Sequence, residues 1–190
     1  MKDSPKPSIS VLVTCYNRAL YIEDALDSIL HQDYEGELEC IIVDDASTDD
    51  SASIIKRYIE AHKNEMNFKL IELEKNSGVA CAMDYAMAAA KYEWFLMADS
   101  DDIQLPNRCS RTAALIEKYP KVLMISAAGQ HMSANGEVLD TVQPPFYCSF
   151  EHAPEELYLK TAKQRAWNWL NKRGRSENYR FSGVCASQFV

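Results

Sequence analysis

The chain has 190 residues with 47% hydrophobic and 25% charged side chains, values typical of one well-packed globular domain, and no stretch approaches the roughly 18 apolar residues of a membrane span. Its net charge of −8 is unevenly distributed, because residues 1–102 carry 21 acidic and 9 basic side chains while residues 103–190 carry 7 and 11. The acidic first half argues against a nucleic-acid partner, and it admits an anionic ligand only where a cation mediates.

Short apolar runs alternate with helical patterns along the first 130 residues. A strand is predicted over residues 9–14, and Ile22, Leu26 and Ile29 then lie on one face of a helix. The same alternation predicts, in order, a strand over 38–43, a helix opened by a capping-box pattern at Ser47, a strand over 68–73, a helix over 78–91, a strand over 94–98, a helix from Pro106 to Tyr119, a strand over 123–132 and a hairpin turn at Asn135-Gly136. Such alternation is typical of βαβ units, so we predict an α/β fold with a mostly parallel sheet.

Polar residues collect where three of the predicted strands end. Residues 14–17 follow the first strand, residues 44–45 the second and residues 99–102 the fourth. In parallel sheets, ligands bind beyond the carboxyl ends of the strands, near the point where the strand order reverses. We therefore expect these three segments to meet at one edge of the sheet and to form a pocket.

The stretch WFLMADSDD, residues 94–102, runs an apolar strand directly into three carboxylates. Asp99 and Asp101 are two positions apart, so their side chains point to the same side of an extended backbone. Two carboxylates that share a site favour a neutralising cation, and hard oxygen ligands in small number suit Mg²⁺ or Mn²⁺. On spacing alone, capping and solvation of the loop before Pro106 remains an equal alternative.

Asp44 and Asp45 follow the second strand. Either carboxylate could accept a hydrogen bond from the base or the ribose of a nucleotide. The alternative is that both are ordinary loop carboxylates, since Ser47 and Asp49 are good caps for the next helix.

Four blocks together resemble the family 2 glycosyltransferases of GT-A fold. They are SISVLVTCYNRALYIEDALDSIL, CIIVDDASTDDS, NSGVACAMDYAMAAAKYEWFLMADSDD and the following Pro106. The resemblance covers residues 8–132, with the blocks in the family's order and spacing. It implies a Rossmann-like GT-A core whose D-x-D motif falls on Asp99-Ser100-Asp101.

The resemblance also implies which residues bind the donor and which bind the metal. The residues expected to bind the nucleotide-sugar donor are Thr14, Tyr16, Asn17, Asp44, Asp45, Ser47, Asp99 and Ser100. Asp101 is expected to coordinate the metal, Mn²⁺ or Mg²⁺, with Asp99 as a second ligand and Asp102 in support.

By the same resemblance, the chain should move a sugar from a nucleotide-diphosphate donor, a UDP-sugar in the first instance, to an acceptor hydroxyl with inversion. The acceptor would be a saccharide or a lipid-linked molecule in cell-surface polysaccharide or glycan synthesis. Inversion requires a carboxylate base, which such enzymes carry in an acidic motif after a strand resembling FSGVCASQFV at the end of this sequence. We therefore expect the general base beyond Val190, in a longer protein.

Residues 1–140 are predicted to form the nucleotide-sugar-binding core, and residues 141–190 an acceptor-side helical extension. Seven basic residues and one acidic residue lie between positions 160 and 180, on a predicted helix over 154–173. Packing on its own domain is the favoured role of this helix, and acceptor binding or peripheral contact of residues 155–180 with the inner membrane face are alternatives. Six scattered cysteines without a C-x-x-C pair favour reduced thiols and a cytoplasmic location.

The sequence is less compatible with other functions of α/β proteins. A sugar-phosphate nucleotidyltransferase would need a glycine-rich first turn, which TCYNRAL lacks. A response-regulator-like phosphoacceptor would carry its acidic pair after the first strand, where Thr14 and Cys15 stand instead. A nucleotide-sugar-binding module without turnover remains open, and donor hydrolysis by the full-length protein would separate it from an enzyme.

Overall fold

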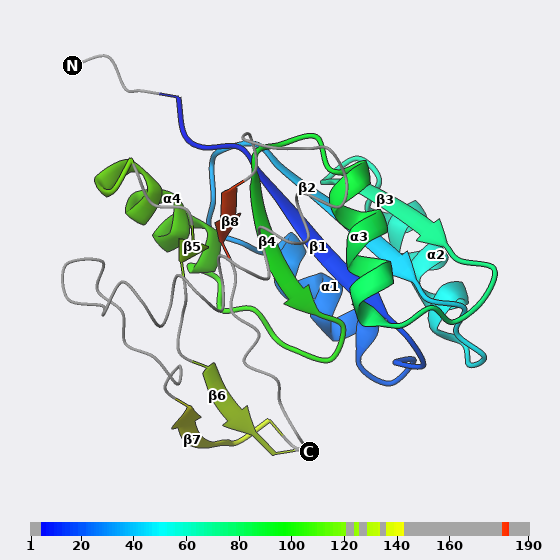
Figure 1. Ribbon diagram of the computed structural model, residues 1–190. Coiled ribbons are helices and arrows are strands. Elements are labelled where there is room, and N and C mark those ends of the chain that lie inside the picture. The colour runs from blue at the N-terminus through cyan, green and yellow to red at the C-terminus, as the bar shows by residue number, and fades with distance from the viewer. Residues whose placement is uncertain (1–4, 121–123, 126–128, 134–135, 143–179, 183–190) are drawn as a thin grey trace, which may run out of the picture. The chain divides into compact units, whose positions relative to one another are not determined.

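The structure is a computed structural model that describes residues 5–120, 124–125, 129–133, 136–142 and 180–182 (Figure 1). The chain forms two compact units, one of Met1–Ser126 with Arg180–Val190 and the other of Ala127–Tyr179. The predicted helix over 154–173 and its membrane contact lie outside the described residues. The predicted boundary between residues 140 and 141 stays a prediction.

The first unit is built on a six-stranded sheet in which every described pairing is parallel. Its strands are β1 (Ile9–Cys15), β2 (Leu38–Asp44), β3 (Asn67–Glu72), β4 (Trp94–Asp99), β5 (Met124–Ile125) and β8 (Arg180–Ser182). Strands β1, β2 and β4 are the most buried, since apolar residues occupy both of their faces. The predicted α/β fold with a mostly parallel sheet is confirmed.

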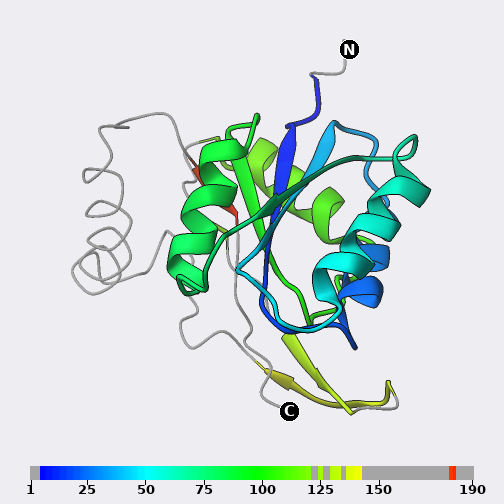
Figure 2. The ribbon, with the colours of Figure 1, turned by 90° about the vertical axis from the view of Figure 1, so that its right-hand side faces the viewer.

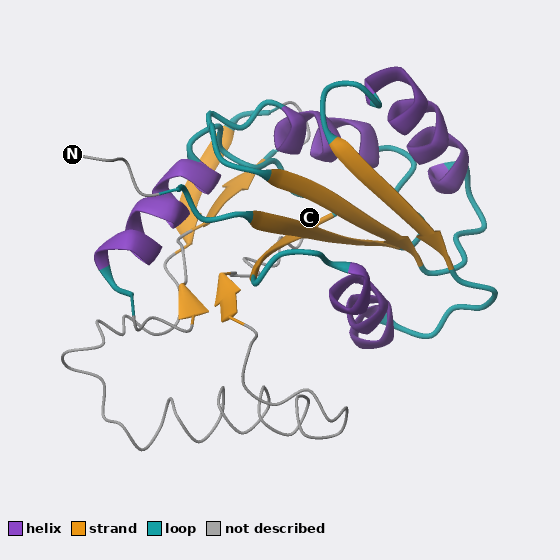
Figure 3. Ribbon diagram, turned by 90° about the horizontal axis from the view of Figure 1, so that it is seen from above, coloured by secondary structure: helices purple, strands orange, loops and turns teal. Residues whose placement is uncertain are grey.

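The helices that flank the sheet in the described residues are α1 (Ile22–Leu30), α2 (Ser51–His62), α3 (Val79–Ala89) and α4 (Arg108–Lys118). Helix α3 covers one face, and the other three cover the opposite face (Figures 2 and 3). Alternate residues of β1 divide the core between these layers: Val11 and Val13 belong to the cluster that contains Leu26 of α1 and Ile55 of α2. The side of α3 that is buried carries Ala82 and Ala86, whose small size permits a close approach to the strands.

The strand order is β3-β2-β1-β4-β8-β5. Strand order therefore reverses between β1 and β4, since β2 and β3 lie on one side of β1 and the later strands lie on the other. In open α/β sheets this reversal leaves a crevice at the carboxyl ends of the two strands, because their connections depart in opposite directions. The polar segments predicted to form a site leave the sheet at this place.

Three local predictions need correction. The single strand predicted over residues 123–132 is two elements, β5 in the main sheet and β6 (Gly129–Met132) in a separate two-stranded sheet. The capping box at Ser47 does not form, since α2 begins at Ser51 and Asp49 accepts a hydrogen bond from the Ser51 amide at 2.9 Å. Pro106 lies in the turn before α4 and not at its first position, because that helix begins at Arg108.

The second unit contains an antiparallel hairpin of β6 with β7 (Val138–Val142). Gly136 has a φ of +86°, a conformation that glycine adopts without steric cost, which is the physical basis of the predicted turn. Across the hairpin, His131 Nδ1 lies 2.7 Å from Asp140 Oδ1. Within the described residues, no helix has the length and apolar character needed to cross a membrane.

Candidate functional site

The strand register brings the three predicted segments together at the carboxyl edge of the sheet. Thr14 of β1 is aligned with Asp99 of β4, and Cys15 is aligned with Asp44 of β2. The Asp45 amide continues this alignment by donating to the Cys15 carbonyl at 2.8 Å. Residues more than 80 positions apart in the sequence therefore share one edge at the reversal of strand order.

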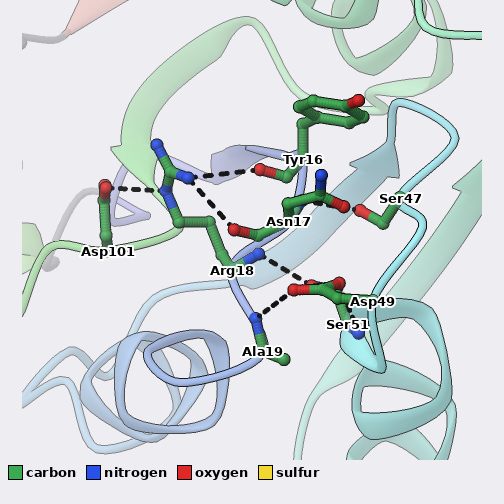
Figure 4. A network of polar contacts seen from close by, with 8 residues as sticks. All are labelled: Tyr16, Asn17, Arg18, Ala19, Ser47, Asp49, Ser51 and Asp101. Atoms are coloured by element: carbon green, nitrogen blue, oxygen red, sulfur yellow. Dashed lines mark hydrogen bonds and ion pairs between the residues drawn. The ribbon is translucent and has the colours of Figure 1, made fainter.

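The loop after β1 is fixed to the loop after β2 by hydrogen bonds (Figure 4). The Asn17 amide donates to Ser47 Oγ at 2.9 Å, and Asn17 Oδ1 accepts from the Thr48 amide at 2.8 Å. The Arg18 amide donates to the buried Ser51 Oγ at 2.8 Å. Asn17 has a φ of +54°, a left-handed conformation that asparagine tolerates better than most residues. Asn17 and Ser47, predicted to bind the donor, are thus engaged with each other in this structure.

The ring of Tyr16 stands on the same loop and is 41% exposed. Its carbonyl oxygen accepts a hydrogen bond from Arg18 Nη1 at 3.3 Å, so its backbone is held while its ring stays accessible. An exposed aromatic ring at a ligand edge offers a flat surface on which a base or a sugar can stack.

Asp44 is 3% exposed at the end of β2. Its Oδ2 accepts a hydrogen bond from the Ser47 amide at 3.0 Å, whereas its Oδ1 is buried and has no hydrogen-bond partner within the described part of the chain. A buried acceptor without a partner costs about 1–3 kcal/mol. A ligand that brings an N–H or O–H group to this oxygen would recover that free energy.

Asp45, also 3% exposed, has both carboxylate oxygens occupied. The backbone amides of Ser77 and Gly78 donate to its Oδ1 and Oδ2, each at 2.7 Å. Gly78 is the N-cap of α3, where the helix dipole favours a negative charge. The carboxylate therefore fixes the segment that leads into α3, although the side chains of this segment are exposed.

Asp101 forms an ion pair with Arg18, whose Nε donates to Oδ2 at 2.8 Å. Ser100, between the two aspartates of the D-x-D motif, is buried at 5% exposure. The Asp102 amide donates to the Asp99 carbonyl at 3.3 Å, so the chain turns at the end of β4 and the three carboxylates stay close together.

The closeness of the three carboxylates affects the ionisation of Asp102. Burial and the charges of Asp99 and Asp101 raise its pKa from 3.8 to about 6, although Arg108 opposes the shift. Its Oδ1 is buried and has no hydrogen-bond partner among the residues that the structure describes. The surroundings of Asp102 therefore disfavour its charged form.

The acidic turn fits a divalent cation of the magnesium type. Its ligands are hard carboxylate oxygens, and one of them, on Asp102, is an orphaned buried acceptor. Within the part of the chain that the structure describes, no group of three or more histidine, cysteine, aspartate or glutamate side chains could hold a metal ion by itself. Mg²⁺ and Mn²⁺ suit such a site, because one or two carboxylates suffice when substrate phosphates and water supply the other ligands.

The raised pKa of Asp102 predicts a pH-dependent stability. Between pH 3.8 and about 6 the folded state retains a proton that the unfolded chain releases, so stability falls as pH rises and the loss is complete above about pH 6. In EDTA at pH 7.5, Asp102→Asn should therefore raise the free energy of unfolding by about 1 kcal/mol, a value reduced for the half-buried position. Urea unfolding at pH 7.5 and pH 4 measures this, and the gain should shrink at pH 4. An equal gain at both pH values would contradict it.

Sequence reasoning missed two arginines of the site. Arg18 pairs with Asp101, and Arg108 lies close enough to Asp102 to oppose its pKa shift while donating to the Met97 carbonyl at 2.7 Å. Arg18 carried a usable signal, since it is the first arginine of an acidic half and directly follows Tyr16 and Asn17. Arg108 carried none, because its position beside the turn depends on how α4 packs.

Comparison with known proteins gives the family. The sequence model of glycosyl transferase family 2 matches residues 10–179. The chain belongs to this family. The resemblance found in the four sequence blocks is thereby confirmed, and the chain is a member of a family of glycosyltransferase enzymes.

Two curated relatives carry the names of glycosyltransferases. The poly(ribitol-phosphate) β-N-acetylglucosaminyltransferase TarS of Staphylococcus aureus is 37% identical over 123 residues, which are 63% of this chain and 21% of TarS. The putative teichuronic acid biosynthesis glycosyltransferase TuaG of Bacillus subtilis is 33% identical over 153 residues, which are 80% of this chain and 55% of TuaG. The chain thus spans between a fifth and just over half of these family members.

Two solved structures of glycosyltransferases share the fold. Residues 1–349 of S. aureus TarS in complex with UDP-GlcNAc superpose with a TM-score of 0.57 and 32% identity, over 66% of this chain and 34% of that one. The mannosyltransferase PcManGT of Pyrobaculum calidifontis, in complex with GDP-Man and Mn²⁺, gives a TM-score of 0.58 and 32% identity, over 65% and 36%. The predicted GT-A fold is confirmed.

Proposed function

We propose that this chain binds the donor in a metal-dependent, inverting glycosyltransferase that moves a sugar from a nucleotide-diphosphate sugar to an acceptor hydroxyl. The observation that carries the proposal is the register that sets Thr14 beside Asp99, and Cys15 beside Asp44, at the reversal of strand order. A UDP-sugar is the first candidate donor, because TarS was solved with UDP-GlcNAc. A GDP-sugar is the second, because PcManGT was solved with GDP-Man.

Asp44 is proposed to recognise the base. Its unpartnered Oδ1 requires a hydrogen-bond donor, and its Oδ2 is held in place by the Ser47 amide. Uracil and guanine each carry a ring N–H group, whereas cytosine and adenine in a nucleotide offer only exocyclic amino N–H groups. We propose that Asp44 selects by the position of the donor and accepts from the ring N–H, which favours the first two bases. Thr14 at the end of β1 and the exposed ring of Tyr16 would complete the nucleoside contacts.

Asn17, Ser47 and Asp45 are proposed to act mainly by holding the loops around the donor. Asn17 and Ser47 join the first two loops, and Asp45 holds residues 77–78 at the start of α3. Preorganisation of this kind removes an ordering cost that the donor would otherwise meet on binding.

Asp101 and Asp99, with Ser100 between them, are proposed to hold Mn²⁺ or Mg²⁺ together with the diphosphate, and Asp102 to support them. When bound, the cation neutralises charge on the departing nucleoside diphosphate. Inversion further requires a base that takes the proton of the acceptor hydroxyl, and we place that base outside the described residues. From the names of TarS and TuaG, we propose a saccharide or lipid-linked acceptor in the synthesis of a cell-surface polysaccharide.

A ligand screen tests the donor assignment. The full-length protein should show a raised thermal midpoint with UDP- or GDP-sugars in the presence of Mn²⁺, and a smaller rise in EDTA, because ligands that bind only the folded state stabilise it. CDP- and ADP-sugars serve as matched controls, since their bases offer no ring N–H to Asp44. Equal stabilisation by all four nucleotides, or by none, would overturn the proposal.

A further inference from the structure

The ion pair between Arg18 and Asp101 joins the first loop to the D-x-D turn across 83 positions of the sequence (Figure 4). It is the contact by which the protein itself supplies a positive charge to Asp101, at 2.8 Å between Nε and Oδ2. Both side chains remain partly exposed, at 42% for Arg18 and 34% for Asp101. The pair is therefore accessible to ions and ligands from solvent.

The backbone of Arg18 is held by contacts that do not involve its side chain. The Arg18 amide donates to Ser51 Oγ at 2.8 Å, and the neighbouring Ala19 amide donates to Asp49 Oδ2 at 3.1 Å. The guanidinium also donates from Nη1 to the carbonyls of Tyr16 and Asn17, at 3.3 and 3.1 Å. Rotation of the side chain would release Asp101 together with the carbonyls of Tyr16 and Asn17, while the two backbone amides would keep the loop attached to Ser51 and Asp49.

The guanidinium is suited to a second anion. It has five N–H donors, and the contacts to Asp101, Tyr16 and Asn17 use those of Nε and Nη1. The N–H groups of Nη2 have no partner among the residues that the structure describes. A planar guanidinium matches phosphate oxygens in pairs, which a lysine ammonium cannot do.

We propose that Arg18 is an internal counter-ion that occupies Asp101 until a divalent cation replaces it, and that the released guanidinium then binds the diphosphate of the donor. The inference rests on the proposed function, because it takes Asp101 as the metal ligand. A divalent cation on either oxygen of the Asp101 carboxylate would lie within a few Å of the guanidinium on Oδ2, and like charges at such distances repel, so the metal and Arg18 compete for this carboxylate. Metal binding thus frees the Arg18 guanidinium to bind the diphosphate. In this way Arg18 couples the binding of the metal to the binding of the nucleotide.

The coupling can be measured as binding, without turnover. The experiment titrates Mn²⁺ into the full-length protein, follows free Mn²⁺ by electron paramagnetic resonance, and repeats the titration with UDP or GDP present. Without nucleotide, Arg18→Gln should bind Mn²⁺ about two- to five-fold more tightly than the wild type, since the competing ion pair is gone. The factor by which the nucleotide tightens Mn²⁺ binding should fall by roughly ten-fold, since a charged hydrogen-bond donor to the diphosphate is lost. By reciprocity, the factor by which Mn²⁺ tightens nucleotide binding should fall equally.

Two further variants, one conservative and one a control, complete the test. Arg18→Lys retains the charge without the planar fork, so it should keep part of the coupling, and it carries the test if Arg18→Gln fails to fold. Lys6→Gln breaks the exposed ion pair of Lys6 with Glu35, before the amino end of β1, and should leave both affinities unchanged.

The outcomes separate this inference from the proposed function. The wild type could bind Mn²⁺ and nucleotide cooperatively while Arg18→Gln, without nucleotide, binds Mn²⁺ with the same or a lower affinity than the wild type. This result would overturn the inference but not the proposed donor site. A merely structural role for Arg18 gives that result, because a distorted site binds metal less well. A wild type that binds neither Mn²⁺ nor UDP or GDP would overturn both.

Discussion

Asp101→Asn should lower metal-dependent turnover by about 10²-fold or more, because the amide removes the charge that holds the cation beside the leaving diphosphate. Arg18 would also lose its ionic partner, but that exposed pair contributes only about 0.2–1 kcal/mol to stability. The fold should therefore persist while activity is lost. Nucleotide release from a UDP- or GDP-sugar, measured across a range of Mn²⁺ concentrations, gives the result.

A matched control for Asp101→Asn is Asp24→Asn, the same chemical change on the exposed surface of α1. It should leave turnover and its metal dependence unchanged. Unchanged turnover in Asp101→Asn would sink the assignment of the D-x-D motif as the metal site, provided that the wild type is active under the same conditions.

Asp45→Asn should lower the free energy of unfolding by about 1–2 kcal/mol, because one of the two part-buried hydrogen bonds to the Ser77 and Gly78 amides loses its charged acceptor. The amide group of asparagine can accept from either Ser77 or Gly78, and it turns its own N–H₂ toward the other. Urea unfolding reports the loss. Hydrogen exchange locates it, since the amide protons of Ser77 and Gly78 should lose protection.

Asp50→Asn is the control for this stability effect, since Asp50 is exposed and makes no side-chain cap at the start of α2. Its expected change lies within about 0.5 kcal/mol. If Asp45→Asn keeps full stability but binds the donor more weakly, the loop-holding role is contradicted. Asp45 would then belong to the residues that contact the nucleotide directly.

The strand pattern was predictable because it is local. Strands β1, β2 and β4 are apolar runs buried on both faces, and their polar ends must share one edge if the strands are parallel. The break between β5 and β6 was not predictable in this way. Both belong to one apolar stretch, and the sheet that each joins depends on distant partners: β8 for β5 and β7 for β6.

The partners of the site residues were harder to predict than the site itself. Asp45 binds backbone amides 32 and 33 positions away, and backbone donors leave no mark in a sequence motif. Ser47 has the spacing of a helix cap, but its hydroxyl accepts from the Asn17 amide, since the left-handed turn at Asn17 brings that donor near. Local spacing therefore predicted that the three segments share one edge of the sheet, but it misassigned the capping role of Ser47, because long-range hydrogen bonds competed for it.

The most direct test of the donor-metal site is anomalous diffraction from crystals of the full-length protein soaked with Mn²⁺ and UDP or GDP. We expect one strong manganese peak within coordination distance of the Asp101 carboxylate, a bound diphosphate beside it, and the Arg18 guanidinium turned away from Oδ2. A manganese peak remote from Asp101, or a bound nucleotide with the Arg18–Asp101 pair intact and no manganese beside it, would contradict the account.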